Sequence, residues 1–139
     1  MDALRVLIVD DEEDFVTALV ERLNLRGLQA AGVTTGAEAL AHIGRSPCDV
    51  VLLDVKMPGL GGLAVFERLK RERPTLPVVL LTGLGSAQDA ERGMALGAFD
   101  YLMKPVKIDH LIRVLRAAVA REDGASAHDR EPTRGQNHD

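Results

Sequence analysis

The stretch Val50-Val51-Leu52-Leu53-Asp54 decides the fold class, because four consecutive aliphatic residues lead directly into an acid. A continuous apolar run of strand length is typical of a strand that is buried on both faces of a parallel sheet. The same pattern recurs at residues 6–9 and 78–81. We therefore expect a parallel sheet that carries helices on both faces.

Weaker signals complete the pattern on either side of these runs. Residues 28–33 and 99–102 fit two further strands, while residues 15–23 and 108–119 place their apolar side chains at helical spacing. Five strand–helix units follow, and right-handed crossovers between them keep the strands parallel. The sequence thus predicts an α/β protein with a doubly wound, five-stranded parallel sheet.

Length and composition limit the function classes. A chain of 139 residues forms one ordinary domain. Its net charge of −4 and the absence of a basic stripe argue against direct nucleic-acid binding. No export signal precedes the first apolar run, and every apolar run is too short to cross a bilayer. With Cys48 as the only cysteine, expected to be a small buried hydrophobe, we expect a cytoplasmic protein without a membrane partner.

The chain is expected to divide at residue 121. Residues 1–121 carry the strand–helix pattern, whereas the only apolar side chains of residues 122–139 are Ala125 and Ala127. Such a segment buries too little surface to offset its ordering entropy. We predict a disordered tail there, or the start of a linker.

Polar side chains stand at the carboxyl ends of four predicted strands. The first strand ends in Asp10 and Asp11, the third in Asp54 and the fourth in Thr82, and the fifth is followed by Lys104. In open α/β sheets, ligands bind at this edge. Oxygen donors without His or Cys suit a hard cation such as Mg²⁺, and a carboxylate can take up a phosphoryl group as an acyl phosphate.

Four segments, in this order, resemble the signatures of bacterial two-component response-regulator receiver domains. The resemblance covers roughly residues 4–121, and the motifs are specific as a set although each one alone is weak. The segments are Val9-Asp10-Asp11-Glu12, Leu53-Asp54-Val55-Lys56-Met57-Pro58-Gly59, Leu81-Thr82-Gly83 and Asp100-Tyr101-Leu102-Met103-Lys104-Pro105.

The resemblance implies a flavodoxin-like strand order of 2-1-3-4-5 and a sensor histidine kinase as phosphoryl donor. It implies that Asp54 is the phosphoacceptor. It also implies that Asp10, Asp11, Asp54 and the backbone carbonyl of Lys56 bind Mg²⁺. The chain is then a signalling switch that assists its own phosphoryl transfer and dephosphorylation, and is not otherwise an enzyme.

The same resemblance assigns the output side of the switch. Thr82 and Lys104 stabilise the phosphoryl group, and Thr82 with Tyr101 forms the switch pair. The Lys104–Pro105 peptide bond is expected to be cis. The face formed by residues 86–120 is expected to bind a downstream protein or effector domain, or to form a homodimer.

Other interpretations compete with this one. Residues 59–64 match the dinucleotide pattern G-x-G-x-x-A, although these glycines also suit a tight turn beside the acidic pocket. A small metal-dependent phosphotransferase or phosphatase would use the same aspartyl-phosphate chemistry. A third alternative is a pseudo-receiver, a binding module that has lost phosphorylation. Residue by residue, Asp11 could simply favour a helix N-terminus, Asp54 could form a turn, and Tyr101 could be an ordinary strand aromatic.

Overall fold

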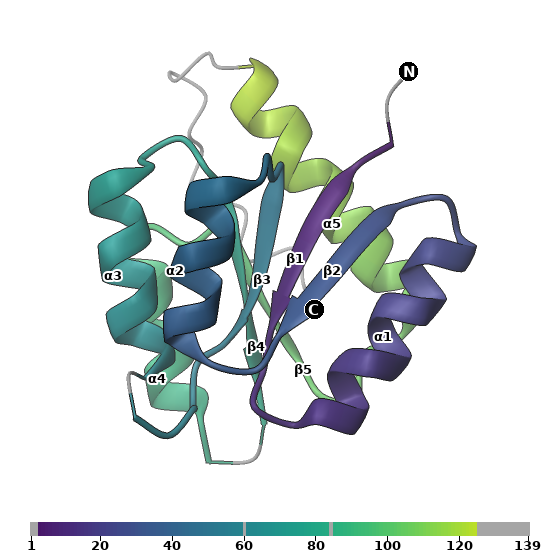
Figure 1. Ribbon diagram of the computed structural model, residues 1–139. Helices are drawn as coiled ribbons and strands as arrows, with labels where there is room; N and C mark the ends of the chain where they lie inside the picture. The colour runs from purple at the N-terminus through teal and green to yellow at the C-terminus, as the bar shows by residue number, and fades with distance from the viewer. Residues whose placement is uncertain (1–2, 60, 84, 125–139) are drawn as a thin grey trace.

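The computed structural model describes residues 3–59, 61–83 and 85–124, within which strands and helices alternate along the chain (Figure 1). Each strand is followed by one helix, as the five strand–helix units predict. The elements are β1 (Arg5–Val9), α1 (Glu13–Leu25), β2 (Gln29–Val33), α2 (Gly36–Arg45), β3 (Val50–Asp54), α3 (Gly62–Glu72), β4 (Val78–Thr82), α4 (Ala87–Ala95), β5 (Asp100–Met103) and α5 (Ile108–Gly124).

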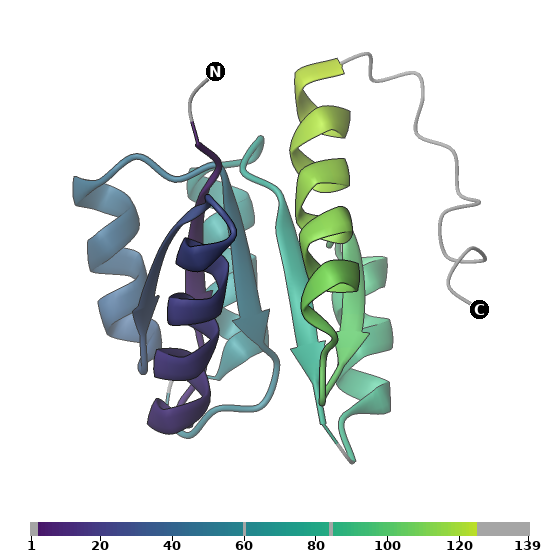
Figure 2. The ribbon, with the colours of Figure 1, turned by 90° about the vertical axis from the view of Figure 1, so that its right-hand side faces the viewer.

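The strands form one sheet in the order β2-β1-β3-β4-β5, and all four neighbouring pairs are parallel. This arrangement confirms the predicted doubly wound sheet and its order 2-1-3-4-5. Helices α1 and α5 cover one face, and α2, α3 and α4 cover the other (Figures 1 and 2). The molecule is therefore a three-layer sandwich with the sheet in the middle.

Alternate side chains of the central strands supply the two cores. Ile8 and Leu52 pack with α1 and α5, whereas Leu7 and Leu53 pack with α2 and α3. Every residue of β3 and β4 is buried. This double burial explains why the aliphatic runs are continuous and do not alternate with polar residues.

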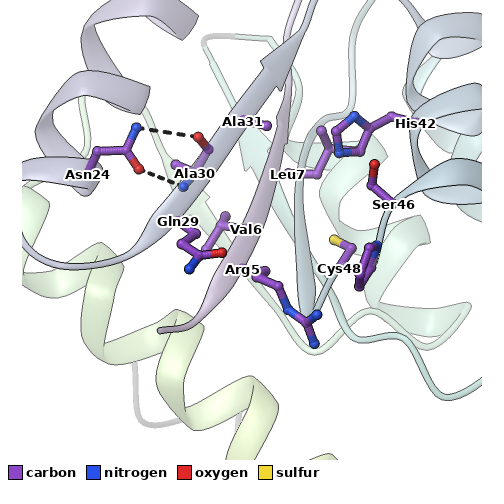
Figure 3. A pocket seen from close by; sticks show the side chains of 11 residues that line it. Arg5, Val6, Leu7, Asn24, Gln29, Ala30, Ala31, His42, Ser46 and Cys48 are labelled. Carbon is purple, nitrogen blue, oxygen red and sulfur yellow. Dashed lines mark hydrogen bonds between the residues drawn. The ribbon is translucent and has the colours of Figure 1, made fainter. Parts of the chain in front are cut away.

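The outer strand β2 uses side chains as partners for its backbone. The amide of Asn24 accepts a hydrogen bond from the Ala30 N–H at 2.7 Å and donates one to the Ala30 carbonyl at 3.4 Å. Figure 3 shows both bonds beside a hollow of about 510 Å³. At the other end of β2, Glu38 Oε1 accepts from the Thr34 N–H at 3.2 Å. Two side chains thus occupy positions that a neighbouring strand would fill.

The observed ends of several elements differ from the predicted ones by a few residues. Strands β3 and β4 end at Asp54 and Thr82, as predicted, but β2 begins at residue 29 instead of 28, and β5 spans residues 100–103 instead of 99–102. Helix α5 continues to Gly124, so the first three residues of the predicted tail are helical. Residues 125–139 lie outside the described residues, and the disorder predicted for them stays a prediction. Over the described part of the chain, no helix is both long and apolar enough to span a membrane.

Candidate functional site

The carboxyl ends of β1, β3, β4 and β5 bring the predicted polar residues to one edge of the sheet. Asp10 directly follows β1, Asp54 and Thr82 end β3 and β4, and Lys104 directly follows β5. Backbone hydrogen bonds extend the ladder into this edge, since Lys104 N donates to the Thr82 carbonyl at 2.8 Å and Val55 N to the Leu81 carbonyl at 3.1 Å. Asp54 and Thr82 are thus held within the sheet, and Asp10 and Lys104 are the residues that directly follow it.

Three carboxylates cluster at this edge. Asp10, Asp11 and Asp54 each offer an oxygen within 4.8 Å of the others. Asp10 is completely buried and Asp54 is 5% exposed, whereas Asp11 is exposed to solvent. Like charges this close repel one another unless a cation neutralises them. The cluster suits Mg²⁺, which prefers oxygen ligands and keeps several water molecules.

Backbone donors hold two of these carboxylates in place. Glu12 N donates to Asp10 Oδ1 at 3.0 Å, and Lys56 N donates to Asp54 Oδ1 at 3.2 Å. Each acid thereby accepts a hydrogen bond from the residue two positions later, which turns the chain away from the strand end. One oxygen of each carboxylate is fixed by the fold.

Burial raises the pKa of the Asp54 carboxyl to about 6 from its ordinary 3.8. The hydrogen bond from Lys56 N opposes this rise, as does the positive charge of Lys104, while the negative charges of Asp10 and Asp11 add to it. The metal-free pocket therefore disfavours the anion that a nucleophilic carboxylate must be. Any cation bound between the three acids would reverse this preference.

Lys104 reaches over the cluster and contacts two acids. Its Nζ lies 2.8 Å from Asp10 Oδ2 and 2.6 Å from Glu12 Oε1, and 4.7 Å from the centre of the Phe15 ring. Among the described residues, no ion pair within 4.0 Å joins Lys104 to Asp54. Burial alone would lower the pKa of Lys104, but its hydrogen bonds to Asp10 and Glu12 raise it above the ordinary value. The ammonium stays charged and lies toward β1.

The predicted switch residues lie on neighbouring strands. Thr82 is buried, and its Oγ1 lies 3.5 Å from the Leu102 carbonyl, at the limit of a hydrogen bond. Tyr101 is 39% exposed on β5. A Cβ added at Gly83 would meet no atom of the described residues within 4 Å, so the residue after Thr82 leaves open space beside it. The role of Thr82 and Tyr101 as a switch pair stays a prediction.

The glycine-rich loop after β3 has a packing explanation. A Cβ on Gly62 would lie 2.0 Å from the Asp54 carbonyl oxygen and 2.6 Å from Val55 Cα. Gly59 adopts a left-handed φ of 72°, which glycine tolerates best. These two positions let α3 begin directly against the end of β3. The match of residues 59–64 to a dinucleotide pattern is thus explained by this turn; Leu60 lies outside the described residues.

The Lys104–Pro105 bond is cis, as expected. Cys48, His42 and His110 do not belong to the acidic cluster. The Cys48 thiol is partly buried and donates to the Val50 carbonyl at 3.3 Å, and burial raises its pKa to about 11. The raised pKa disfavours the thiolate, which is the reactive form of a cysteine. His110 is exposed, and His42 lines the hollow of Figure 3.

Sequence reasoning missed the contact between Glu12 and Lys104. Glu12 belongs to the acidic run after β1, but the run alone does not indicate which acid turns toward a lysine 92 positions later. It also missed the ring of Phe15 beneath the ammonium and the approach of Lys56 Nζ to Asp89 Oδ2 at 4.0 Å.

Comparison with known proteins places these features in context. A family model described as the response regulator receiver domain matches residues 6–116. The sensory transduction protein RegX3 of Mycobacterium tuberculosis is 41% identical over 116 residues, which are 84% of this chain and 51% of that protein. YkoG of Bacillus subtilis, an uncharacterized transcriptional regulatory protein, is 37% identical over 93% of this chain and 56% of its own length.

Solved structures agree with the sequence comparisons. The crystal structure of a response regulator receiver domain protein from Clostridium thermocellum superposes with a TM-score of 0.83 at 30% identity, covering 88% of this chain and 98% of that one. The chain spans about half the length of the curated relatives it matches.

Proposed function

The chain belongs to the response regulator receiver domain family, and from this membership we propose that it takes up a phosphoryl group on Asp54 with the help of Mg²⁺. Receiver domains are the phosphorylation-dependent signalling modules of two-component systems and not classical enzymes. The observation that carries the assignment is the cluster of Asp10, Asp11 and Asp54 oxygens, all within 4.8 Å, with Lys104 beside it.

Asp54 is the best placed of the three acids to act as the nucleophile. It ends the central strand β3, and its carboxylate has an oxygen within 4.8 Å of those of Asp10 and Asp11. In the proposed transfer, an Asp54 oxygen forms a bond to phosphorus while the bond from phosphorus to the kinase histidine nitrogen breaks. The leaving nitrogen keeps the electron pair, so the step needs no oxidant or reductant.

The Mg²⁺ would be held by Asp10, Asp11, Asp54 and the backbone carbonyl of Lys56. It would neutralise charge on the phosphoryl oxygens. Asp10 is suited to this role because it is buried, already carries a backbone hydrogen bond on Oδ1, and cannot turn to solvent. Lys104 and Thr82 would supply an ammonium and a hydroxyl to the phosphoryl group.

Phosphorylation would change partner binding through movements of Thr82 and its neighbours. As its hydroxyl turns toward the phosphoryl oxygens, Tyr101 would move inward into the space it leaves. That movement would alter the face made by α4, β5 and α5, residues 86–120, which we propose binds a downstream protein, an effector domain or a second copy. Such a change is a shift between two pre-existing states. The sensor histidine kinase as donor is likewise part of the proposal, since the chain spans only about half of its curated relatives.

Phosphoryl uptake itself can be tested by intact-mass spectrometry. With acetyl phosphate and Mg²⁺ the protein should gain one phosphoryl group that hydroxylamine removes, because an acyl phosphate is labile to that nucleophile. With a chelator in place of Mg²⁺ the adduct should be absent. Equal adduct formation under both conditions would contradict the metal-assisted mechanism, and turnover of many acetyl phosphate molecules per second would favour the enzyme alternative.

The metal site predicts a stability that depends on both Mg²⁺ and pH. The folded pKa of Asp54, about 6, exceeds the unfolded 3.8, so the folded chain keeps a proton that the unfolded chain has released between these values. The stability that this bound proton contributes is complete below pH 3.8 and is lost as the pH rises through about 6. Mg²⁺ should therefore raise the free energy of unfolding most above that range, by about 2.7 kcal/mol at one hundred times its Kd.

Urea unfolding at about pH 7.5 and about pH 5, with and without Mg²⁺, checks this prediction, since the proton and the cation compete for one carboxylate. Asp11→Ala should lose most of the response to Mg²⁺. Asp14→Ala is the matched control, because Asp14 is also exposed but does not belong to the cluster. If the parent protein shows the same stability with and without Mg²⁺ at the higher pH, the metal-site assignment is wrong.

A further inference from the structure

We propose that Glu12 is a positioning residue that holds the Lys104 ammonium on the β1 side of the pocket and competes with a phosphoryl group for it. This inference rests on the proposed function of Asp54. Glu12 would thereby weaken the retention of the phosphoryl group. Its carboxylate lies 2.6 Å from Lys104 Nζ, the shortest of the contacts that the ammonium makes.

The backbone of Glu12 is fixed, while its side chain is available to Lys104. Glu12 is the residue immediately before α1, and its N–H is bonded to Asp10 Oδ1. The position is one where a short side chain usually accepts a hydrogen bond from the first turn of the helix. The Glu12 side chain makes no such capping bond. It extends instead to Lys104, so the residue does not stabilise its own helix in this way.

The contacts of Lys104 define the competition. An ammonium has three N–H donors, and here the carboxylates of Asp10 and Glu12 each lie within hydrogen-bond distance of it. The Phe15 ring covers a further side at 4.7 Å. To serve a phosphoryl group on Asp54, the ammonium has to give up part of this arrangement. Once a cation neutralises Asp10, Glu12 remains as the anion that draws the ammonium away.

The solvent exposure of Glu12 and Lys104 sets how much the loss of their ion pair should change phosphoryl affinity. Glu12 has 62% of its side chain exposed, and the Lys104 side chain has 20%. A partly exposed ion pair contributes little, so removing the carboxylate should change phosphoryl affinity by about threefold to tenfold and not by orders of magnitude. Two effects act in the same direction, because Glu12→Gln frees the ammonium and also removes a negative charge near the incoming dianion.

The test measures how tightly each variant binds beryllofluoride in saturating Mg²⁺, by NMR titration. We expect Glu12→Gln to bind it about threefold to tenfold more tightly than the parent, as for a surface ion pair. Glu13→Gln is the matched control: it removes the same charge from the next residue, which is exposed and has no ion pair within 4.0 Å to Lys104. This control should change the affinity by less than about twofold.

A double-mutant cycle separates competition for Lys104 from general electrostatics. In a Lys104→Met background, Glu12→Gln should no longer differ from Glu13→Gln. If Glu12→Gln weakens binding, leaves it unchanged, or has its full effect without Lys104, the proposed competition is wrong while the phosphoacceptor role of Asp54 stands.

The side-chain resonances of Lys104 in the unliganded protein give a second readout. They should shift in Glu12→Gln and stay in place in Glu13→Gln, and unchanged resonances in both variants would overturn the positioning role directly. A parent protein that binds no beryllofluoride would overturn the proposed function as well as this inference. The two failures are therefore distinguishable.

Discussion

The Asp54→Asn variant should form no hydroxylamine-sensitive phosphoryl adduct with acetyl phosphate and Mg²⁺. An amide oxygen is a far weaker nucleophile than a carboxylate, and the substitution also removes one of the three acids of the cluster. The loss should be complete within the detection limit of intact-mass spectrometry, because Asp10 is fully buried and paired with Lys104, and Asp11 is exposed to solvent. Adduct at the parental level would move the phosphoacceptor to another residue.

Two controls make this result specific to Asp54. Asp14→Asn changes an exposed acid outside the cluster and should leave the adduct intact. Beryllofluoride should shift the NMR resonances of β5 in the parent but not in Asp54→Asn, since the switch is driven from the acceptor. Shifts confined to the pocket of the parent, with Tyr101 unmoved, would leave the proposed Thr82–Tyr101 switch without support.

The Asp54→Asn variant should also fold and be more stable than the parent in metal-free buffer. Burial disfavours the Asp54 anion, as its pKa of about 6 indicates, and the neutral amide avoids that penalty. With allowance for the solvent-facing side of the pocket, the gain above pH 6 should be about 1–2 kcal/mol. Urea unfolding then distinguishes a lost nucleophile from a lost fold.

Gly62→Ala should be the most destabilising single-methyl change in the loop after β3. The added Cβ would lie 2.0 Å from the Asp54 carbonyl oxygen and 2.6 Å from Val55 Cα. Both atoms belong to the backbone, so no side chain can rotate away. Forcing α3 off β3 should cost about 3 kcal/mol or more, at the upper end of overpacking effects. The displaced Asp54 should also bind Mg²⁺ more weakly.

Gly44→Ala provides the control with the opposite expected sign. Gly44 lies in α2, and a Cβ there would meet no atom within 4 Å. Alanine should stabilise this helix by about 0.5–1 kcal/mol, because glycine is the poorer helix former. Urea unfolding of the two variants compares the same chemical change in two environments. A Gly62→Ala protein as stable as the parent would mean that the glycine is not needed for the approach of α3 to β3.

The elements of the fold were predictable because burial on both faces leaves a simple pattern. The aliphatic runs of β1, β3 and β4 marked the centre of the sheet, whereas the strand order came from the resemblance to receiver domains. The errors have physical causes. Strand β5 runs to Met103, one residue past its expected end, because backbone pairing continues there between Met103 and Thr82. Helix α5 extends past residue 121 because a polar helical turn needs no burial to continue from a packed one.

The site was predictable as a set of residue types but not as a set of contacts. Parallel strands place their carboxyl ends together, so the meeting of Asp10, Asp54 and Lys104 followed from the topology. Which of the nearby acids Lys104 contacts depends on side-chain directions, and no motif specifies these. Its contact with Glu12 therefore appeared only with the structure.

The hydrogen bonds from Asn24 to Ala30 have a consequence for how chains meet one another. An outermost strand with free N–H and C=O groups is a template on which another molecule can lay its own strand, and such pairing propagates into aggregates. Here the Asn24 amide supplies one donor and one acceptor to Ala30, and the Glu38 carboxylate supplies an acceptor to the Thr34 N–H, directly after β2. At these two positions the protein's own side chains occupy the backbone groups of this edge, which disfavours the addition of a further strand there.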